Sequence, residues 1–278
     1  MQFEINKFNE EGFAGPFKFL NEENCNKLLD EKYLPKRNYG WTKSIHEKSS
    51  KVVNFASSEI ILEKIKNVLG SDILLWSSCF IEQKPGGQHS WHIDLEYRLW
   101  KGVTIWIGLK NLNNNTPLSI ISHSHNIDNF PQALKDKNIN IQNDEDVLLE
   151  AKKVDPRCEL KTFHLKPGEF IIWSGKIWHK TNNLSKKNRE SIILQYCSTD
   201  NVVKIPVNYD YKNMKWSDNK PACILVSGED KKKLNNVIDK SKFKINENFF
   251  FEAFYFFKVK YYRIRYILSS TYRKIFTK

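Results

Sequence analysis

Residues 89–97 read HSWHIDLEY, and this stretch gives the first indication of both the fold and the chemistry. In a β-strand, side chains two positions apart point to the same face of the sheet. His92 and Asp94 would therefore bring an imidazole nitrogen and a carboxylate to one point, where such groups can hold a divalent metal ion. Two ligands do not complete a metal site, so the rest of the chain must supply a third.

A candidate third ligand lies in GEFIIWSGKIWHKTNNLSKKNRESIILQYC, residues 168–197. His179 follows an apolar run and a Ser-Gly turn, and Arg189 opens the next apolar run. The planar guanidinium of arginine can make two parallel hydrogen bonds to a carboxylate. Thr181, two residues past His179, could add a hydroxyl to the same carboxylate. The chain therefore contains His-x-Asp, a long gap, His, and then Arg ten residues further on.

Helical and strand-like patterns divide the chain. We expect one helix with Asn21 as its N-cap and a second helix capped by Ser57 or Ser58. From Ile73 onward, short apolar or alternating runs are separated by turn-forming residues, which is typical of strands in a barrel or sandwich. A polar, partly helical excursion is expected at about residues 126–160. The strand-like runs are ILLWSSCFIEQ (73–83), VTIWIGL (103–109), PLSII (117–121), EFIIW (169–173) and SIILQYC (191–197).

Alternation along the last of these runs adds a further candidate residue. It would point Arg189, Ser191, Ile193 and Gln195 to one side of the strand. If Arg189 faces a cavity, Gln195 is then expected to line that cavity too.

Composition limits the class of protein. The 278 residues are enough for one large domain or two modest ones, and no run of eighteen apolar residues predicts a spanning helix. The five cysteines lack CxxC spacing, and the start of the chain lacks a secretory signal, so we expect a reducing, cytoplasmic location. The net charge of +12 suggests anionic partners, but no zinc-finger spacing, aromatic RNA-binding signature or phosphate-binding glycine loop is present.

The ordered set of residues resembles that of the Fe(II)- and 2-oxoglutarate-dependent dioxygenases. Its flanks narrow the resemblance to the phytanoyl-CoA dioxygenase-like family, over roughly residues 10–200. The similar segments are FNEEGFAGPFKFLNEENCNKLLD (8–30), KPGGQHSWHID (84–94), VTIWIGLKNLNNNTPLSIISHSH (103–125) and GEFIIWSGKIWHKTNN (168–183). The chain departs from the family at Thr116, where glycine is usual, and at residues 122–125, which read SHSH instead of PGSH.

The resemblance implies an all-β core with flanking helices. The expected fold is a double-stranded β-helix, the jelly-roll or cupin-like architecture, with N-terminal helices and a C-terminal helical tail. The dioxygenase domain would span residues 1–200, with a jelly-roll core at about 73–200. Residues 201–278 would form a C-terminal extension.

The resemblance also implies a reaction and its cofactors. His92, Asp94 and His179 would bind Fe(II), and two histidines with one carboxylate leave three positions open on an octahedral metal. 2-Oxoglutarate would take two of these positions, and O2 the third. The far carboxylate of 2-oxoglutarate would bind Arg189 and Thr181, and the family adds Gln83 and Trp106 as candidate cosubstrate contacts. The expected reaction hydroxylates an unactivated C–H bond while 2-oxoglutarate becomes succinate and CO2. A halogenase is disfavoured because Asp94 occupies the position that a halide needs.

Two other functions stay open at the level of sequence. The chain could be a catalytically inactive jelly-roll module that binds a metal or ligand. A nucleic-acid-binding protein or demethylase is suggested only by the net charge, and nucleic acid is the least favoured partner because the catalytic segment lacks a coherent basic stripe. The substrate itself is expected to be a small molecule, or a lipid- or glycan-linked one.

The last residues suggest a membrane contact. Residues 248–278 read NFFFEAFYFFKVKYYRIRYILSSTYRKIFTK. Aromatic and aliphatic residues recur there at three- and four-residue spacing with lysine and arginine between them, as in helices that lie on anionic membrane surfaces. Packing of this tail on the catalytic domain or in a dimer is the alternative. A membrane contact would make a lipid-linked or glycan-precursor substrate more favourable.

Overall fold

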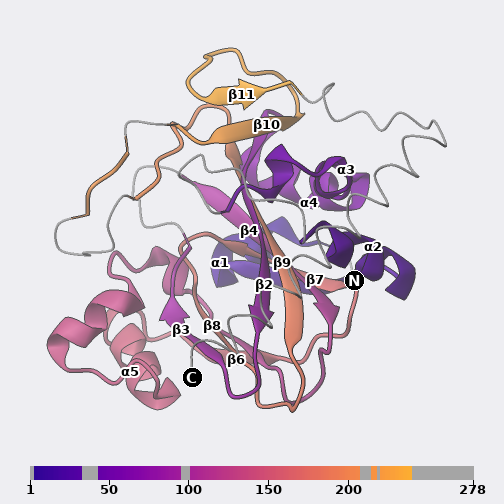
Figure 1. Cartoon of the computed structure of the whole chain (residues 1–278). Coiled ribbons are helices and arrows are strands. Elements are labelled where there is room, and N and C mark those ends of the chain that lie inside the picture. The colour runs from indigo at the N-terminus through magenta and orange to yellow at the C-terminus, as the bar shows by residue number, and fades with distance from the viewer. Residues whose placement is uncertain (1–2, 33–42, 95–100, 207–213, 218–219, 240–278) are drawn as a thin grey trace, which may run out of the picture.

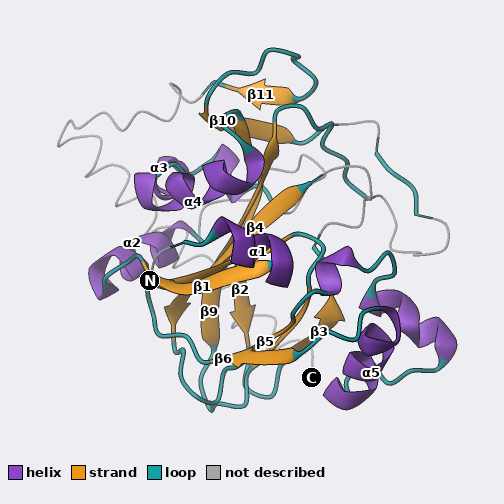
Figure 2. Cartoon of the chain, turned by 180° about the vertical axis from the view of Figure 1, so that it is seen from behind, coloured by secondary structure: helices purple, strands orange, loops and turns teal. Residues whose placement is uncertain are grey.

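The computed structural model describes residues 3–32, 43–94, 101–206, 214–217 and 220–239, and all structural statements concern these residues. Two β-sheets form the centre of the chain (Figures 1 and 2). The larger sheet has seven strands in the order β1-β7-β4-β9-β2-β10-β11, and the smaller has four in the order β3-β8-β5-β6. This arrangement confirms the expected double-stranded β-helix.

The strands of the large sheet are β1 (Phe13–Lys18), β2 (Ile73–Gln83), β4 (Gly102–Lys110), β7 (Glu169–Ser174), β9 (Arg189–Ser198), β10 (Ala222–Ser227) and β11 (Asn236–Ile238). Those of the small sheet are β3 (Gln88–His92), β5 (Leu118–Ile121), β6 (Leu160–Phe163) and β8 (Trp178–Asn182). The central strand β9 pairs antiparallel with β4 on one side and with β2 on the other. It opens with Arg189, as the apolar pattern predicts.

Helices cover the outer face of the large sheet. They are α1 (Ile5–Glu11), α2 (Glu22–Glu31), α3 (Ser50–Ala56) and α4 (Glu59–Leu69), with the short 3-10 helix η1 (Ile45–Glu47). The Asn21 side chain accepts a hydrogen bond from the Asn24 N–H and begins α2, as expected. Ser58 occupies the N-cap position of α4, although its hydroxyl makes no capping bond. The sequence pattern did not predict α3.

Alternation on β4 and β9 separates two apolar cores. On the outer face, Val103, Ile105 and Ile107 pack with Ile192 and the helices. On the inner face, between the two sheets, Trp106, Ile171 and Ile193 of the large sheet pack against Leu118 and Ile120 of β5 in the small sheet. The inner face therefore carries the even-numbered residues of β4 and the odd-numbered residues of β9, as the alternation along β9 predicts.

The excursion expected at residues 126–160 is partly helical. It contains the 3-10 helix η3 (Pro131–Lys137) and the helix α5 (Asp144–Val154), while η2 (Ser124–Asn126) lies at its start. This region packs on the outer side of the small sheet, where Trp91, Trp178 and Val147 belong to one buried cluster. Figures 1 and 2 both show α5 beside β3.

Residues after 200 add strands to the large sheet. β10 pairs antiparallel with β2, and β11 pairs parallel with β10. Cys223, Ile224 and Val226 of β10 are buried in the cores. The expected C-terminal extension therefore contributes two strands that continue the large sheet. The tail at residues 248–278 lies outside the described residues, so its helix and its membrane contact stay predictions.

Two further observations concern the cysteines and the predicted absence of a membrane-spanning helix. None of the five cysteines forms a disulfide bond. Among the described residues, no helix is both long enough and apolar enough to cross a membrane.

Candidate metal centre

Two strands of the small sheet bring the sequence-predicted histidines together. β3 and β8 pair antiparallel, and their register places His92 opposite His179. The two imidazole rings lie 4.1 Å apart between centroids. Asp94 comes just after β3, where its backbone N–H donates to the Gly175 carbonyl at 3.0 Å and so ties the end of β3 to the turn before β8.

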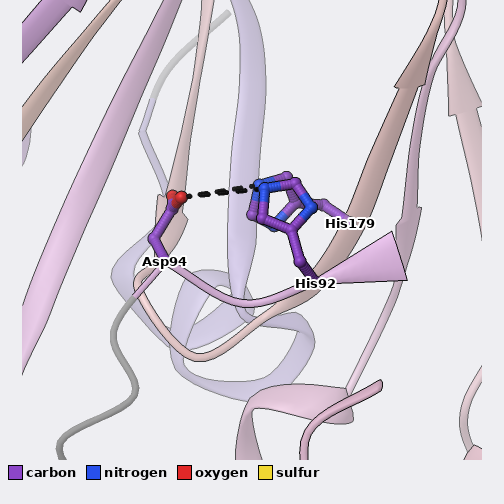
Figure 3. A group of neighbouring side chains, drawn as sticks. All are labelled: His92, Asp94 and His179. Carbon is purple, nitrogen blue, oxygen red and sulfur yellow. Dashed lines mark ion pairs between the residues drawn. The ribbon is translucent and has the colours of Figure 1, made fainter. Parts of the chain in front are cut away.

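The three side chains converge on one point (Figure 3). Asp94 Oδ1 is 4.0 Å from His92 Nε2 and 3.8 Å from His179 Nε2. One ligand atom from each residue lies within 4.8 Å of the others. These separations fit three ligands on one face of a single ion, since metal–ligand distances near 2 Å put neighbouring ligand atoms about 3–4 Å apart.

Hydrogen bonds to the backbone set the tautomer of both histidines. His92 Nδ1 is 2.8 Å from the Ser90 carbonyl, and His179 Nδ1 is 3.0 Å from the Ile177 carbonyl. A carbonyl oxygen can only accept, so each Nδ1 carries the proton. Each Nε2 then presents its lone pair toward the other two side chains, as a metal ligand requires.

The electrostatics of His92 and Asp94 favour the protonation states that bind a metal ion. Burial, followed by the charge of His179, holds the pKa of His92 well below its usual range. Burial acts to raise the pKa of Asp94, but the charges of His179 and Lys43 and hydrogen bonds from Thr104 and Trp173 outweigh it and lower that pKa. A neutral imidazole and an ionised carboxylate are therefore favoured at neutral pH.

Comparison with known proteins decides the family. The family model described as Phytanoyl-CoA dioxygenase matches residues 8–191. The chain belongs to the phytanoyl-CoA dioxygenase family. It is therefore a nonhaem dioxygenase that depends on Fe(II), 2-oxoglutarate and O2, as the sequence resemblance implies. No curated protein sequence matches the chain.

Solved structures share the fold of this dioxygenase at low identity. The apo form of the non-heme monooxygenase ThoJ is 16% identical, with a TM-score of 0.60, over 84% of this chain and 86% of that chain. CytC3 with Fe(II) and alpha-ketoglutarate is 16% identical, with a TM-score of 0.58, over 84% and 92%. The epimerase SnoN in complex with Fe3+, alpha-ketoglutarate and nogalamycin RO is 12% identical, with a TM-score of 0.54, over 70% and 82%.

Arg189 of the dioxygenase is a buried cation on the inner face of β9. Its side chain is 0% exposed, and its guanidinium carbon lies 5.1 Å from the centre of the Trp106 ring. Nη2 donates to Thr181 Oγ1 at 3.4 Å, whereas Nε and Nη1 have no hydrogen-bond partner among the described residues. Burial lowers its pKa to about 10, so the group stays charged at neutral pH.

The other sequence-predicted residues of the dioxygenase take different positions. Gln83 lies opposite Arg189 in the β2–β9 ladder, and its Nε2 donates to the Thr181 carbonyl at 3.1 Å. Gln195 lies further along β9, opposite Thr104 of β4, and its Nε2 is 3.5 Å from Thr104 Oγ1. The structure thus places Thr181 and Trp106 beside the Arg189 guanidinium, with Gln83 bonded to the Thr181 backbone, and places Gln195 beside Thr104, which contacts Asp94.

Two contacts of Asp94 were not predicted from the sequence. Thr104 Oγ1 donates to Asp94 Oδ2 at 2.8 Å, and Trp173 Nε1 donates to the same oxygen at 3.0 Å. The alternation that turns Trp106 inward also turns Thr104 inward, so the pattern in VTIWIGL contained a signal for Thr104. Trp173 ends an apolar run, and nothing in the sequence distinguishes it from a core tryptophan.

Proposed function

We propose that this dioxygenase hydroxylates an unactivated C–H bond of a small-molecule substrate. In this proposal His92, Asp94 and His179 hold Fe(II), and Arg189 holds the far carboxylate of 2-oxoglutarate. When bound, Fe(II) would supply the redox chemistry by which O2 gives one oxygen atom to 2-oxoglutarate, which becomes succinate and CO2, and the other oxygen atom to the substrate C–H bond.

The observation that carries the proposal is the unpaired buried guanidinium of Arg189. Leaving buried donors without partners costs free energy, more so for a charged group. A carboxylate that accepts from Nε and Nη1 would remove this cost. The buried barrel interior also strengthens such a pair, since the attraction between charges rises as the dielectric falls.

The spacing of the residues suits a five-carbon diacid. His179 and Thr181 lie on the inner face of β8, opposite Ile120 and Leu118 of β5. Two residues of a strand rise about 7 Å. An anion on Arg189 and Thr181 would therefore lie about one short dicarboxylate away from the metal ligands. Trp106, whose ring centre lies 5.1 Å from the guanidinium carbon, would help to hold the guanidinium toward the cosubstrate.

Each other residue has a defined part in the proposal. His92 and His179 keep their protons on Nδ1 and so bind the metal through Nε2. Asp94 supplies the negative ligand, and its presence disfavours a halide at that position. Gln83, whose Nε2 is bonded to the Thr181 carbonyl, fixes the backbone that carries Thr181.

Proteins that share this fold bear on the reaction type and the substrate class. They include a non-heme monooxygenase, ThoJ, and an epimerase, SnoN, in complex with the small molecule nogalamycin RO. These reactions belong to those proteins. They support a small-molecule substrate for this chain as a proposal, with a lipid- or glycan-linked substrate as the variant that the C-terminal tail would favour.

The test measures succinate released from 2-oxoglutarate by the full chain with Fe(II) and O2, alone and with candidate small molecules. We expect slow release alone and faster release with the right substrate. His179→Ala and Asp94→Ala should abolish release while the protein stays folded. His164→Ala, a substitution of an exposed histidine outside the centre, is the matched control and should leave release unchanged.

The outcomes separate the competing functions. Substantial succinate release by His179→Ala would overturn the metal assignment. Binding of Fe(II) and 2-oxoglutarate without succinate release under any condition would instead favour the inactive binding module. Release coupled to desaturation or epimerisation of the substrate would retain the centre and overturn the hydroxylation.

A further inference from the structure

The two oxygens of Asp94 have different surroundings. Oδ1 faces the Nε2 atoms of His92 and His179. Oδ2 receives two hydrogen bonds, one from Thr104 Oγ1 at 2.8 Å and one from Trp173 Nε1 at 3.0 Å. Both donors are buried, Thr104 at 1% exposure and Trp173 at 0%. Neither donor can turn to water, so the pair fixes the carboxylate in one orientation.

The hydrogen bonds around Thr104 can be assigned from donor and acceptor chemistry alone. An ionised carboxylate only accepts, so the single hydroxyl proton of Thr104 goes to Asp94 Oδ2. Gln195, 3.5 Å from the Thr104 oxygen, must then present its NH2 group to that oxygen. Gln195 therefore stabilises the one hydroxyl orientation in which Thr104 donates to Asp94.

Three strands of the large sheet hold this chain of contacts. Trp173 of β7 lies opposite Thr104 of β4, and Thr104 lies opposite Gln195 of β9. Directly opposite residues in antiparallel strands share a face and lie about 4.5–5.5 Å apart between their Cβ atoms. The β-ladder thus sets the positions of the Asp94 donors, although Asp94 itself lies beyond the end of β3.

We propose that Thr104 and Trp173 are positioning residues that make Asp94 a one-oxygen metal ligand, and that Gln195 acts on Asp94 through Thr104. This inference rests on the proposed metal site. Oδ2, which has two donors, is kept away from the ion, so the carboxylate occupies one coordination position instead of two. The position that a second oxygen would block stays open for the cosubstrate or O2.

In the test, the metal-free full chain is titrated with Co(II), with and without 2-oxoglutarate. The affinity for Co(II) and the visible absorption spectrum are measured. Thr104→Val removes the hydroxyl but keeps the shape, and Trp173→Phe removes the N–H but keeps an aromatic ring beside His179. Loss of such outer partners typically lowers metal affinity about 10- to 100-fold. We expect a loss of that size in each variant, together with a changed spectrum as Oδ2 joins the ion.

Rescue and control variants distinguish positioning from general stability. Thr104→Ser keeps the hydroxyl and should restore affinity and spectrum. Trp178→Phe is the matched control, because Trp178 Nε1 donates to the Asn129 carbonyl and the side chain is 1% exposed on the other face of β8. Gln195→Leu should weaken binding less than Thr104→Val, and should add no further loss in the Thr104→Val background.

The results that would refute the positioning role differ from those that would refute the proposed metal site. Wild-type affinity and spectrum in both Thr104→Val and Trp173→Phe would refute the positioning role, even with Asp94→Ala unable to bind. Binding of Co(II) by Asp94→Ala as tight as in the wild type would instead refute the proposed metal site. An equal loss in Thr104→Ser and Thr104→Val would also refute the hydrogen-bond role.

Discussion

At the scale of single residues, the buried charge of Arg189 is expected to destabilise the protein when no cosubstrate is bound. A buried cation whose Nε and Nη1 have no hydrogen-bond partner among the described residues destabilises the ligand-free state. Replacing buried charges by apolar groups of similar size is often stabilising by about 1–4 kcal/mol. In the proposed function, the same charge attracts the cosubstrate. Removing the charge of Arg189 should therefore weaken the binding of 2-oxoglutarate and raise the stability of the cosubstrate-free protein.

We predict that Arg189→Met raises the thermal midpoint of the metal-free, cosubstrate-free protein and weakens 2-oxoglutarate binding. Removing one partner of a buried charge pair costs about 3–5 kcal/mol, which corresponds to more than about a hundredfold in affinity. Thr181→Val should cost about 1 kcal/mol, the value of one hydrogen bond. Thermal unfolding with and without 2-oxoglutarate and Fe(II) measures both effects. An Arg189→Met protein that 2-oxoglutarate still stabilises as strongly as the wild type would show that another cation binds it.

At the scale of elements, the sequence predicted the long apolar strands of the jelly-roll better than the strands that follow residue 200. The runs at 73–83, 103–109, 117–121, 169–173 and 191–197 all became strands because their alternation or apolar character reflects two buried faces. β10 was missed, since its short segment follows an irregular, polar stretch. The cluster of His92, Asp94 and His179 could be predicted because the spacing of these residues has chemical meaning, whereas the hydrogen bond from Trp173 to Asp94 depends on a pairing between distant strands.

One contact between elements carried no signal in the sequence. His46, in η1, is 0% exposed and joins two strands, with Nδ1 2.7 Å from Ser78 Oγ of β2 and Nε2 2.9 Å from the Ala222 carbonyl of β10. The carbonyl must accept, so Nε2 carries the proton and Nδ1 accepts from Ser78. Burial lowers the pKa of His46 to about 4, against a weaker opposing effect of the bond to Ala222.

This depressed pKa predicts a pH dependence of stability. In the unfolded chain a histidine has a pKa of about 6.5. Above that pH neither state is protonated, and the full stability is present. As the pH falls from about 6.5 toward 4, only the unfolded chain gains the proton, so His46 lowers the free energy of unfolding by about 1.4 kcal/mol per pH unit.

Urea unfolding at pH 7, 6 and 5 checks this prediction in the wild type and in His46→Gln. We expect the variant to be less stable at pH 7, because glutamine does not reproduce both hydrogen bonds at their present geometry. The difference between the two proteins should shrink as the pH falls. Parallel curves for the two proteins would exclude His46 as the titrating group.

At the scale of the whole molecule, the sequence predicts a function for its last residues that the described part of the structure does not reach. The tail at 248–278 combines aromatic residues with lysine and arginine. Each basic residue near an anionic bilayer contributes about 1 kcal/mol of attraction, and salt screens it. We therefore predict that the full chain cosediments with phosphatidylserine-containing vesicles at low salt and less at high salt.

A chain ending near residue 245 is the control for this prediction. It keeps β10 and β11 and removes the basic aromatic segment. It should lose vesicle binding while keeping the release of succinate. Equal sedimentation of both chains, or of neither, would remove the membrane contact and leave packing as the interpretation of the tail.

The position of β9 in the middle of the large sheet has a consequence for the order in which the protein is made. β4 emerges from the ribosome about eighty residues before β9, and β2 emerges earlier still, yet β9 is the strand that joins them. Until β9 arrives, β4 lacks one of its partner strands and β2 lacks both, and such unpaired edges favour pairing with other chains. Folding of the sheet should therefore wait for β9 and be slow, since most contacts of β9 close long loops. Arg189, the first residue of that strand, would be among the last parts of the centre to take its place.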